Sequence, residues 1–375
     1  MNFAFSEEQE TFRAQLRRCF AEHASTPAVF RAMESGAGFD RALWKRLAGE
    51  LGLPGLHLPE AYGGQGFGFL ELGIALEEAG RVLFPSPLFS TVCLAANAIL
   101  NAGSEPQKRA LLPGIASGDQ LATLALLEPG GDWSPESVRL VFEPSRDGHR
   151  LTGSKRFVTD AATADLILVA ARREGTSGLD GLGLFVVRAG AAGLRVTPVE
   201  PLDATRKLAH LELAGVPAES LGEPGGTGAA LARSLDQARV LLACESAGAA
   251  QHCLDAAVAW AKQRVQFARP IGSFQAIQHK CAEVLLEVAS AQSAAHFASW
   301  AAEQDEGLPL AAAMAKSFCD EAYLRASQES LHIHGGVGFT WEAEPHLHLK
   351  RAKSSETLLG PPAFQRARIA RELGF

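Results

Sequence analysis

An arginine and two glutamines flank a short turn in the segment RVQFARPIGSFQAIQ, which runs from Arg264 to Gln278. The Pro-Ile-Gly sequence within it predicts a turn between two helices, so Arg264 and Gln275 are expected to face that turn. There the guanidinium and the carboxamide can donate hydrogen bonds to a diphosphate, and those from the guanidinium are charge-assisted. The alternative is an ordinary interhelical turn with a solvent-facing arginine.

A glycine-rich segment, HIHGGVG, follows about 55 residues later, from His332 to Gly338. Gly335, Gly336 and Gly338 let backbone amides approach an anionic group closely. A single glycine-rich loop is weak evidence for binding. Its place between two predicted helices, downstream of the arginine motif, strengthens the prediction of a ligand site.

Two H-x-H pairs, His332 with His334 and His346 with His348, raise the question of a metal site. The nearby acids do not share an obvious face with both pairs. We therefore predict no metal site and interpret these histidines as surface or packed residues.

Three segments must position these side chains. Residues 1–118 are predicted to be helical, because Ser6 with the acids after it marks a helix start and Phe69–Leu83 is amphipathic. Residues 119–222 contain short runs rich in Val, Leu, Thr and Phe between turn residues, which predict an antiparallel β domain, either barrel or sandwich. Residues 229–375 return to long Ala- and Leu-rich patterns, which predict a four-helix-bundle-like domain.

Composition excludes several classes of protein. The chain is 47% hydrophobic and 21% charged, as in an ordinary globular protein. Its net charge of −7 comes without a basic stripe, so we expect no nucleic-acid partner. We expect no membrane insertion and, from the acidic polar N-terminus, no signal peptide, hence a cytoplasmic location. The six cysteines form no CxxC pair and are interpreted as core residues in a reducing compartment.

The segments Gln263–His279 and His332–Phe375 resemble the C-terminal domain of acyl-CoA dehydrogenases, and the helix–β–helix order resembles the fold of that family. The resemblance implies FAD as cofactor, held at a subunit interface. Ala268 stands where the family usually has Gly, a change expected to matter little unless the backbone there needs positive φ. By resemblance, this part of the chain supplies to FAD the residues Arg264, Phe267, Gln275, His332, Gly335, Gly336 and Gly338.

The predicted β domain carries a second part of the resemblance. The segment KRFVTD matches a family segment whose aromatic residue and threonine contact the isoalloxazine ring, and Phe157 and Thr159 fill those places. The segment LALLEP matches a strand that lies against the flavin, with Leu127 where the family has Thr. The lost hydroxyl implies one hydrogen bond fewer, roughly 0.5–1.5 kcal/mol. Without the resemblance these would be ordinary strand residues.

The family removes a proton next to the thioester carbonyl with a carboxylate. Most members supply a Glu at the position of Leu359, and a second lineage supplies one just before the arginine that matches Arg239, where this chain has Ala238. Neither aliphatic side chain accepts a proton. A relocated base would be Glu245 or Glu356, with Asp236 as a further acid close in sequence; otherwise Glu245 is paired within the bundle and Glu356 is a surface acid.

These features together resemble the base-lacking subunit of actinobacterial heterotetrameric acyl-CoA dehydrogenases that act on steroid side chains. The resemblance implies α,β-dehydrogenation of an acyl-CoA thioester with FAD, and a homologous partner subunit in which that FAD is chiefly seated. An electron-transfer flavoprotein is implied as electron acceptor by the family alone. Two alternatives remain open: a self-sufficient homo-oligomeric enzyme with a relocated base, and a noncatalytic acyl-CoA-binding or scaffold protein.

Overall fold

The computed structural model describes residues 5–304 and 306–375, which form two compact units. Unit 1 takes the described residues up to Arg31, then Phe69–Pro85 and Arg239–Phe375. Unit 2 takes Ala32–Gly68 and Ser86–Ala238. The order of helices, then strands, then helices along the chain confirms the predicted fold class, whereas the segment boundaries at 118, 222 and 229 stay predictions.

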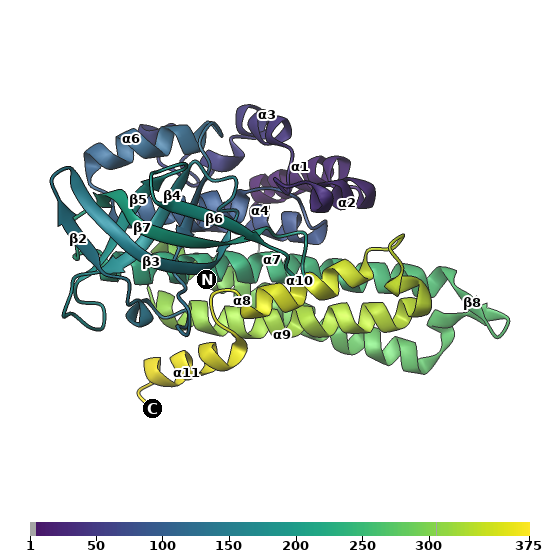
Figure 1. The fold of residues 1–375 in the computed structure, drawn as a ribbon. Coiled ribbons are helices and arrows are strands. Elements are labelled where there is room, and N and C mark those ends of the chain that lie inside the picture. Colours follow the sequence, from purple (N-terminus) through teal and green to yellow (C-terminus); the bar gives the residue numbers. More distant parts are fainter. Residues whose placement is uncertain (1–4, 305) are drawn as a thin grey trace. The chain divides into compact units, whose positions relative to one another are not determined.

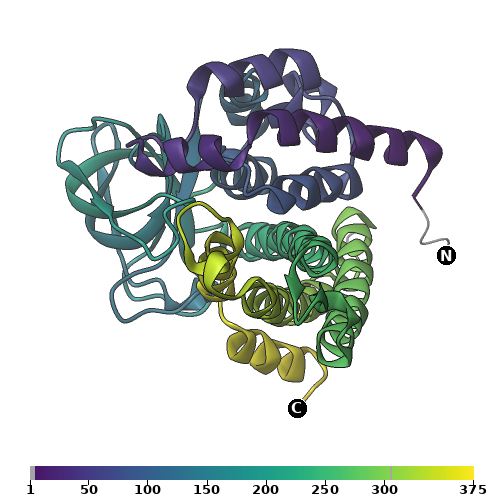
Figure 2. The same cartoon turned by 90° about the vertical axis from the view of Figure 1, so that its right-hand side faces the viewer.

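Unit 1 is helical, and Figures 1 and 2 show its long helices side by side as a bundle. Helices α7 to α10 share one buried core, which includes Leu254, Val284, Tyr323 and Ala352, so the bundle-like domain is confirmed. The uninterrupted helix α7 is 36 residues long, as its lack of a breaker predicts. The helices of this unit are α1 (Glu7–His23), α2 (Thr26–Glu34, which ends in unit 2), α4 (Phe69–Arg81), α7 (Gly228–Gln263, which begins in unit 2), α8 (Gln275–Gln304), α9 (Leu308–His334), α10 (Pro345–Thr357) and α11 (Pro362–Glu372).

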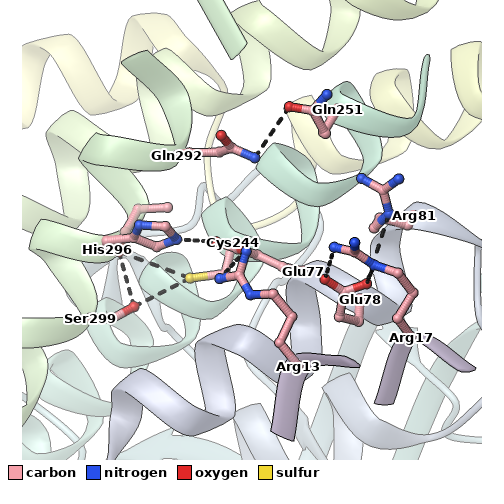
Figure 3. A network of polar contacts seen from close by, with 11 residues as sticks. Arg13, Arg17, Glu77, Glu78, Arg81, Cys244, Gln251, Gln292, His296 and Ser299 are labelled. Carbon is pink, nitrogen blue, oxygen red and sulfur yellow. Dashed lines mark hydrogen bonds and ion pairs between the residues drawn. The ribbon is translucent and has the colours of Figure 1, made fainter. Parts of the chain in front are cut away.

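The N-terminal helices of unit 1 are held by buried carboxylates. Ser6 caps α1 in a capping box with Gln9, as its sequence predicts. Helix α4 is covered on more than one face, because α1 and α8 both pack against it. Every residue from Leu72 to Gly80 is buried, the polar ones included. Burial of its two adjacent glutamates requires partners, and Figure 3 shows them: Glu77 lies between Arg13 and His296, and Glu78 pairs with Arg17 and Arg81.

Unit 2 contains a seven-stranded sheet with the order β1-β4-β5-β7-β3-β2, and β6 pairs with β7. The strands are β1 (Ala122–Ala125), β2 (Phe142–Ser145), β3 (Gly148–Thr159), β4 (Leu166–Arg172), β5 (Leu182–Arg188), β6 (Leu194–Val199) and β7 (Leu208–Leu221). The helical elements of the unit are α3 (Arg41–Leu51), α5 (Asn97–Ala102), α6 (Glu105–Ala116), the short turns η1 (Leu53–Gly55), η2 (Glu60–Tyr62) and η4 (Pro135–Ser137), and a π-helical stretch, η3 (Leu88–Ala96).

The prediction of an antiparallel domain is wrong for one strand pair. Strand β1 pairs with β4 in parallel, so the sheet is mixed, and its described strands form no closed barrel. Burial alternation along a strand does not encode the direction of its neighbour. Between β1 and β4 the chain passes through β2 and β3, which leaves room for the crossover that a parallel pair needs.

None of the helices in the described part of the chain is long and apolar enough to cross a membrane.

Candidate active site

The arginine motif lies where α7 ends. The amide of Arg264 donates to the carbonyl of Trp260 over 2.8 Å, and its own carbonyl accepts from the amide of Ile271, also over 2.8 Å. Between them the chain makes a two-stranded hairpin, β8 (Val265–Gln266) with β9 (Arg269–Pro270), followed by the turn η5 (Ile271–Ser273). The exposed guanidinium of Arg264 makes no hydrogen bond or ion pair with any described residue, so it is free to meet a ligand.

The tip of this hairpin is strained. Phe267 and Ala268 have φ angles of 53° and 59°, the pair of left-handed conformations that a two-residue hairpin turn requires. Ala268 therefore occupies a position where glycine is favoured. The alanine was expected to matter little unless the backbone there needs positive φ, and the backbone does adopt positive φ. A β-carbon there costs about 1–2 kcal/mol in intrinsic conformational energy. Phe267 is 87% exposed at the tip.

Gln275 begins α8 and is exposed. The turn before it is kept tight by a hydrogen bond from the Nε2 of Gln278 to the carbonyl of Gly272, at 2.9 Å. A β-carbon on Gly272 would lie 3.0 Å from the carbonyl oxygen of Ala261, so the turn needs glycine to approach α7 this closely.

The glycine-rich loop reaches the same end of the bundle, because α9 ends there. Ile333 is buried against Ala257 and Ala261 of α7, with Ile271 packed beside them. Gly335 has φ 64° and ψ −143°, a conformation almost restricted to glycine, and it turns the chain into η6 (Gly335–Phe339). Figure 1 shows the β8 hairpin and the turn from α9 to α10 at one end of the bundle.

His332 extends from α9 beside this loop and is mostly exposed. Its Nδ1 lies 3.7 Å from the carboxylate of Glu329, which also pairs with Lys280 of α8. Burial raises the pKa of Glu329, but its interactions with Lys280 and His332 outweigh this effect and hold the pKa below its usual value. The structure thus brings Arg264, Gln275 and His332 to one end of unit 1.

In unit 2 the two residues predicted to face the flavin ring lie on one irregular stretch of β3. The pairing of β3 with β7 shifts register between Lys155 and Val158, and within this bulge Phe157 has a φ of 52° and is 45% exposed. Its amide donates to the Nδ1 of His210 over 3.3 Å. Thr159 is buried, and its carbonyl accepts from the hydroxyl of Thr123 over 2.6 Å.

A buried ion pair beside this bulge was missed from the sequence. Lys155 is fully buried and donates to Glu128 over 2.7 Å and to the carbonyl of Leu126 over 3.0 Å. Burial lowers the pKa of Lys155 to about 8, against the opposing effect of Glu128. The sequence shows both residues, Glu128 in LLEP and Lys155 in KRFVTD, but nothing in their spacing predicts that they form an ion pair.

Leu359, the residue predicted to stand where the family places its base, lies in a turn of unit 1. Leu359 is 1% exposed and has a φ of 61°. Its carbonyl accepts from the Nε of Arg239 over 3.0 Å and from the Nε2 of Gln365 over 2.9 Å. The next residue, Gly360, has a φ of 103°, and a β-carbon on it would lie 2.3 Å from the ring of Phe364.

Family models match three consecutive stretches of the chain: the acyl-CoA dehydrogenase N-terminal domain at residues 6–119, the middle domain at 123–216 and the C-terminal domain at 225–374. The acyl-CoA dehydrogenase IpdE2 of Mycolicibacterium smegmatis is 35% identical over 98% of this chain and 99% of its own length. The chain belongs to the acyl-CoA dehydrogenase family. Members of this family are FAD-dependent oxidoreductases that act on acyl-CoA thioesters.

Two solved structures of acyl-CoA dehydrogenases and related complexes are similar to this chain over nearly its whole length. A variant of the Tcur3481-Tcur3483 steroid ACAD has a TM-score of 0.88 and 34% identity, over 98% of each chain. The ChsE4-ChsE5 complex from Mycobacterium tuberculosis has a TM-score of 0.90 and 28% identity, over 100% of this chain and 99% of the other.

The carboxylates considered for a relocated dehydrogenase base are engaged. Glu245 is buried and forms an ion pair with the equally buried Arg351. Glu356 pairs with Lys353 over 2.8 Å. Breaking the buried pair of Glu245 would leave an uncompensated charge, so its geometry does not favour a free general base.

Another buried acid, Asp320, escaped the sequence analysis. It forms an ion pair with Lys316, one turn away on α9, and both side chains are fully buried. Burial raises the pKa of Asp320 to about 6, against the opposing effect of Lys316. The Nζ of Lys316 also donates to the carbonyl of Ser355 over 2.8 Å, near the end of α10. This pair therefore ties α9 to the helix that leads into the Leu359 turn.

The remaining histidines have packing roles. His334 stacks on Trp260, and His348 stacks on His252 and bonds the hydroxyl of Tyr323 over 2.9 Å. Burial lowers the pKa of His348 to about 3. Across residues 5–304 and 306–375, no three His, Cys, Asp or Glu side chains are grouped so as to hold a metal ion.

The cysteines are free thiols over the described residues, and four of the six are buried. Burial raises the pKa of Cys244 to about 12, so this thiol stays protonated and is a poor nucleophile. The same cause raises the pKa of Cys253 and of Cys319. They behave as the small core residues that the sequence predicts.

Proposed function

We propose that this chain is the base-lacking subunit of a heteromeric, FAD-dependent acyl-CoA dehydrogenase. The observation that carries the proposal is the Leu359 turn. A leucine at positive φ is disfavoured by about 1–2 kcal/mol, yet the turn is held by Arg239 and Gln365. At the position that the resemblance assigns to the family's base, the chain thus holds a buried side chain that accepts no proton.

The second position used by the family for its base agrees with this reading. Ala238 is fully buried and aliphatic. The pairing of Glu245 with Arg351, and of Glu356 with Lys353, argues against the self-sufficient enzyme with a relocated base. We propose that a partner subunit supplies the carboxylate that removes the proton next to the thioester carbonyl.

The residues at the end of the bundle fit FAD. Arg264 and Gln275 are exposed side chains with hydrogen-bond donors, and Gly335 and Gly336 leave open space where a β-carbon would stand. Such donors match a diphosphate. We assign Arg264, Gln275 and the His332–Gly338 loop to the diphosphate part of a FAD seated chiefly in the partner subunit, with Phe267 beside them.

A bound FAD would supply the hydride acceptor that α,β-dehydrogenation of a thioester needs. This chain's own part would be to hold the dinucleotide by Arg264 and Gln275 and to exclude water with the apolar hairpin tip around Phe267. Phe157 and Thr159 are assigned to the ring side of a flavin, on the resemblance of their segment to the family.

Two further parts of the proposal rest on relatives. We propose a bulky, steroid-type acyl-CoA as the substrate class, because the chain is similar to the IpdE2 proteins, the steroid ACAD and the ChsE4-ChsE5 complex. The two solved structures each name two components, which supports a homologous partner subunit. We also propose an electron-transfer flavoprotein as electron acceptor and a cytoplasmic location.

Flavin content and turnover test the proposal. The chain would be purified alone and with a coexpressed homologous subunit, and both preparations assayed with acyl-CoA and an artificial electron acceptor. We expect low turnover from the chain alone and flavin-dependent turnover from the pair. Robust turnover by the chain alone that Glu245→Gln abolishes would replace this proposal with the self-sufficient enzyme. Absence of flavin from both preparations would favour a noncatalytic acyl-CoA-binding or scaffold protein.

A further inference from the structure

Two aromatic rings connect the two motifs at the end of the bundle. The indole of Trp260, on α7, and the imidazole of His334, on α9, stack with their centroids 5.1 Å apart and their planes 25° from parallel. Trp260 lies outside the residues assigned to FAD, and His334, although it lies within the His332–Gly338 loop, has no assigned contact of its own with the cofactor. Both are half-buried, so the stack lies above the buried contact of Ile333 with α7 and extends that contact toward the surface.

Trp260 is bonded directly to the arginine motif. Its carbonyl accepts the amide of Arg264, and this bond is the last helical turn before the hairpin. The indole thus extends from the helical turn that immediately precedes the Arg264 guanidinium.

His334 stands in the same relation to the glycine-rich loop. It is the last residue of α9, and its Nδ1 lies 2.7 Å from the carbonyl of Ser330, to which it donates, so the plane of the ring is fixed. Gly335 follows directly. Gly338 folds back so closely that a β-carbon on it would lie 3.0 Å from the Cβ of His334. The loop thus folds back against the first side-chain carbon of His334.

We propose that Trp260 and His334 are positioning residues for the cofactor. Their stack fixes the glycine-rich loop against Arg264, so that the donors from α7 and α9 are already assembled before FAD arrives. Preorganisation of this kind raises affinity because less ordering remains to be done on binding. The inference rests on the proposed assignment of Arg264 and the loop to FAD.

The stack is tested by the dissociation constant of FAD, measured by titrating flavin into the apo form of the flavin-binding preparation. Trp260→Leu and His334→Leu remove one ring each, and each is expected to raise the constant about ten-fold. In the double variant the constant should rise hardly further, because either change already breaks the stack. His334→Phe keeps a ring in place and is expected to retain FAD within about three-fold.

Trp300→Leu is the matched control. Trp300 stacks on Phe297 at a similar interplanar angle, 29°, within α8 of the same bundle and away from both motifs. The Trp300→Leu variant should lower the urea midpoint of unfolding about as much as His334→Leu does, and it should leave FAD binding unchanged. Equal loss of FAD in His334→Phe and His334→Leu would overturn the stacking role, as would no change in either leucine variant. If Arg264→Ala is also without effect on FAD binding, the assignment of this end of the bundle to FAD fails instead.

Discussion

Removal of the Arg264 side chain tests the proposed cofactor contact separately from the stability of the fold. The side chain is exposed and makes no hydrogen bond or ion pair with any described residue, whereas its backbone bonds to Trp260 and Ile271 remain in any variant. Arg264→Ala should therefore leave the urea midpoint nearly unchanged. Its effect should be confined to FAD.

The size of that effect follows from the kind of bond lost. A hydrogen bond to a charged group contributes about 1.5–3 kcal/mol, which corresponds to an increase of about 10- to 150-fold in the dissociation constant. The solvent exposure of Arg264 favours the lower half of that range. Because the contact is charge-assisted, we also expect the wild-type affinity to fall with added salt more steeply than that of the variant.

Flavin fluorescence during titration of the apo protein measures both quantities. Arg269→Ala is the matched control, since Arg269 lies on the same hairpin and its guanidinium packs over the ring of Phe274 at 4.1 Å. It should change FAD affinity by less than about three-fold. If Arg264→Ala and Arg269→Ala weaken FAD equally, the contact is only general attraction by positive charge. An unchanged constant for Arg264→Ala would refute the assigned role.

Three more predictions concern strain, chemistry and pH. Ala268→Gly should raise the free energy of unfolding by about 0.5–1 kcal/mol, because it relieves a left-handed alanine; an unchanged urea midpoint would contradict this. On the proposal that FAD is seated chiefly in the partner subunit, Leu359→Glu should not raise turnover of the chain alone, compared with Leu359→Gln; a clear gain would refute the partner-subunit reading. Burial raises the pKa of Glu344, but the hydrogen bond and charge of His252 outweigh it and lower this pKa to about 2. Its stabilising contribution should thus be complete above the unfolded pKa near 4.5 and be lost as pH falls toward 2, and Glu344→Gln should flatten that part of the urea stability profile.

Local chemistry made some features predictable from sequence. The helix start at Ser6, the unbroken helix α7 and the strand-rich middle follow from capping residues, the absence of proline and short β-prone runs. The presence of aliphatic residues at positions 238 and 359 is likewise a property of the chain alone. Side-chain chemistry at those two positions excludes proton transfer whatever the fold.

The pairing of charged groups required the tertiary structure. Whether Glu245 is a free base or a structural acid depends on Arg351, more than 100 residues away, and the Lys155–Glu128 pair depends on which strands meet at the β3 bulge. Residue types indicate that a buried carboxylate needs a partner but not which one it has. The parallel direction of β1 beside β4 likewise could not be predicted from the sequence, because the residue pattern of a strand does not specify which strand lies next to it or in which direction.

The sequence by itself determined the family, the order of helical and β segments, and the lack of a carboxylate at Leu359 and Ala238, since these depend on residue identity and short-range pattern. Only the tertiary structure decided that Ala268 and Leu359 adopt positive φ and that Trp260 and His334 stack between the arginine motif and the glycine-rich loop. The backbone conformation of a turn depends on the elements that the turn connects, and contacts between helices depend on packing. Neither can be predicted from a single segment of the chain.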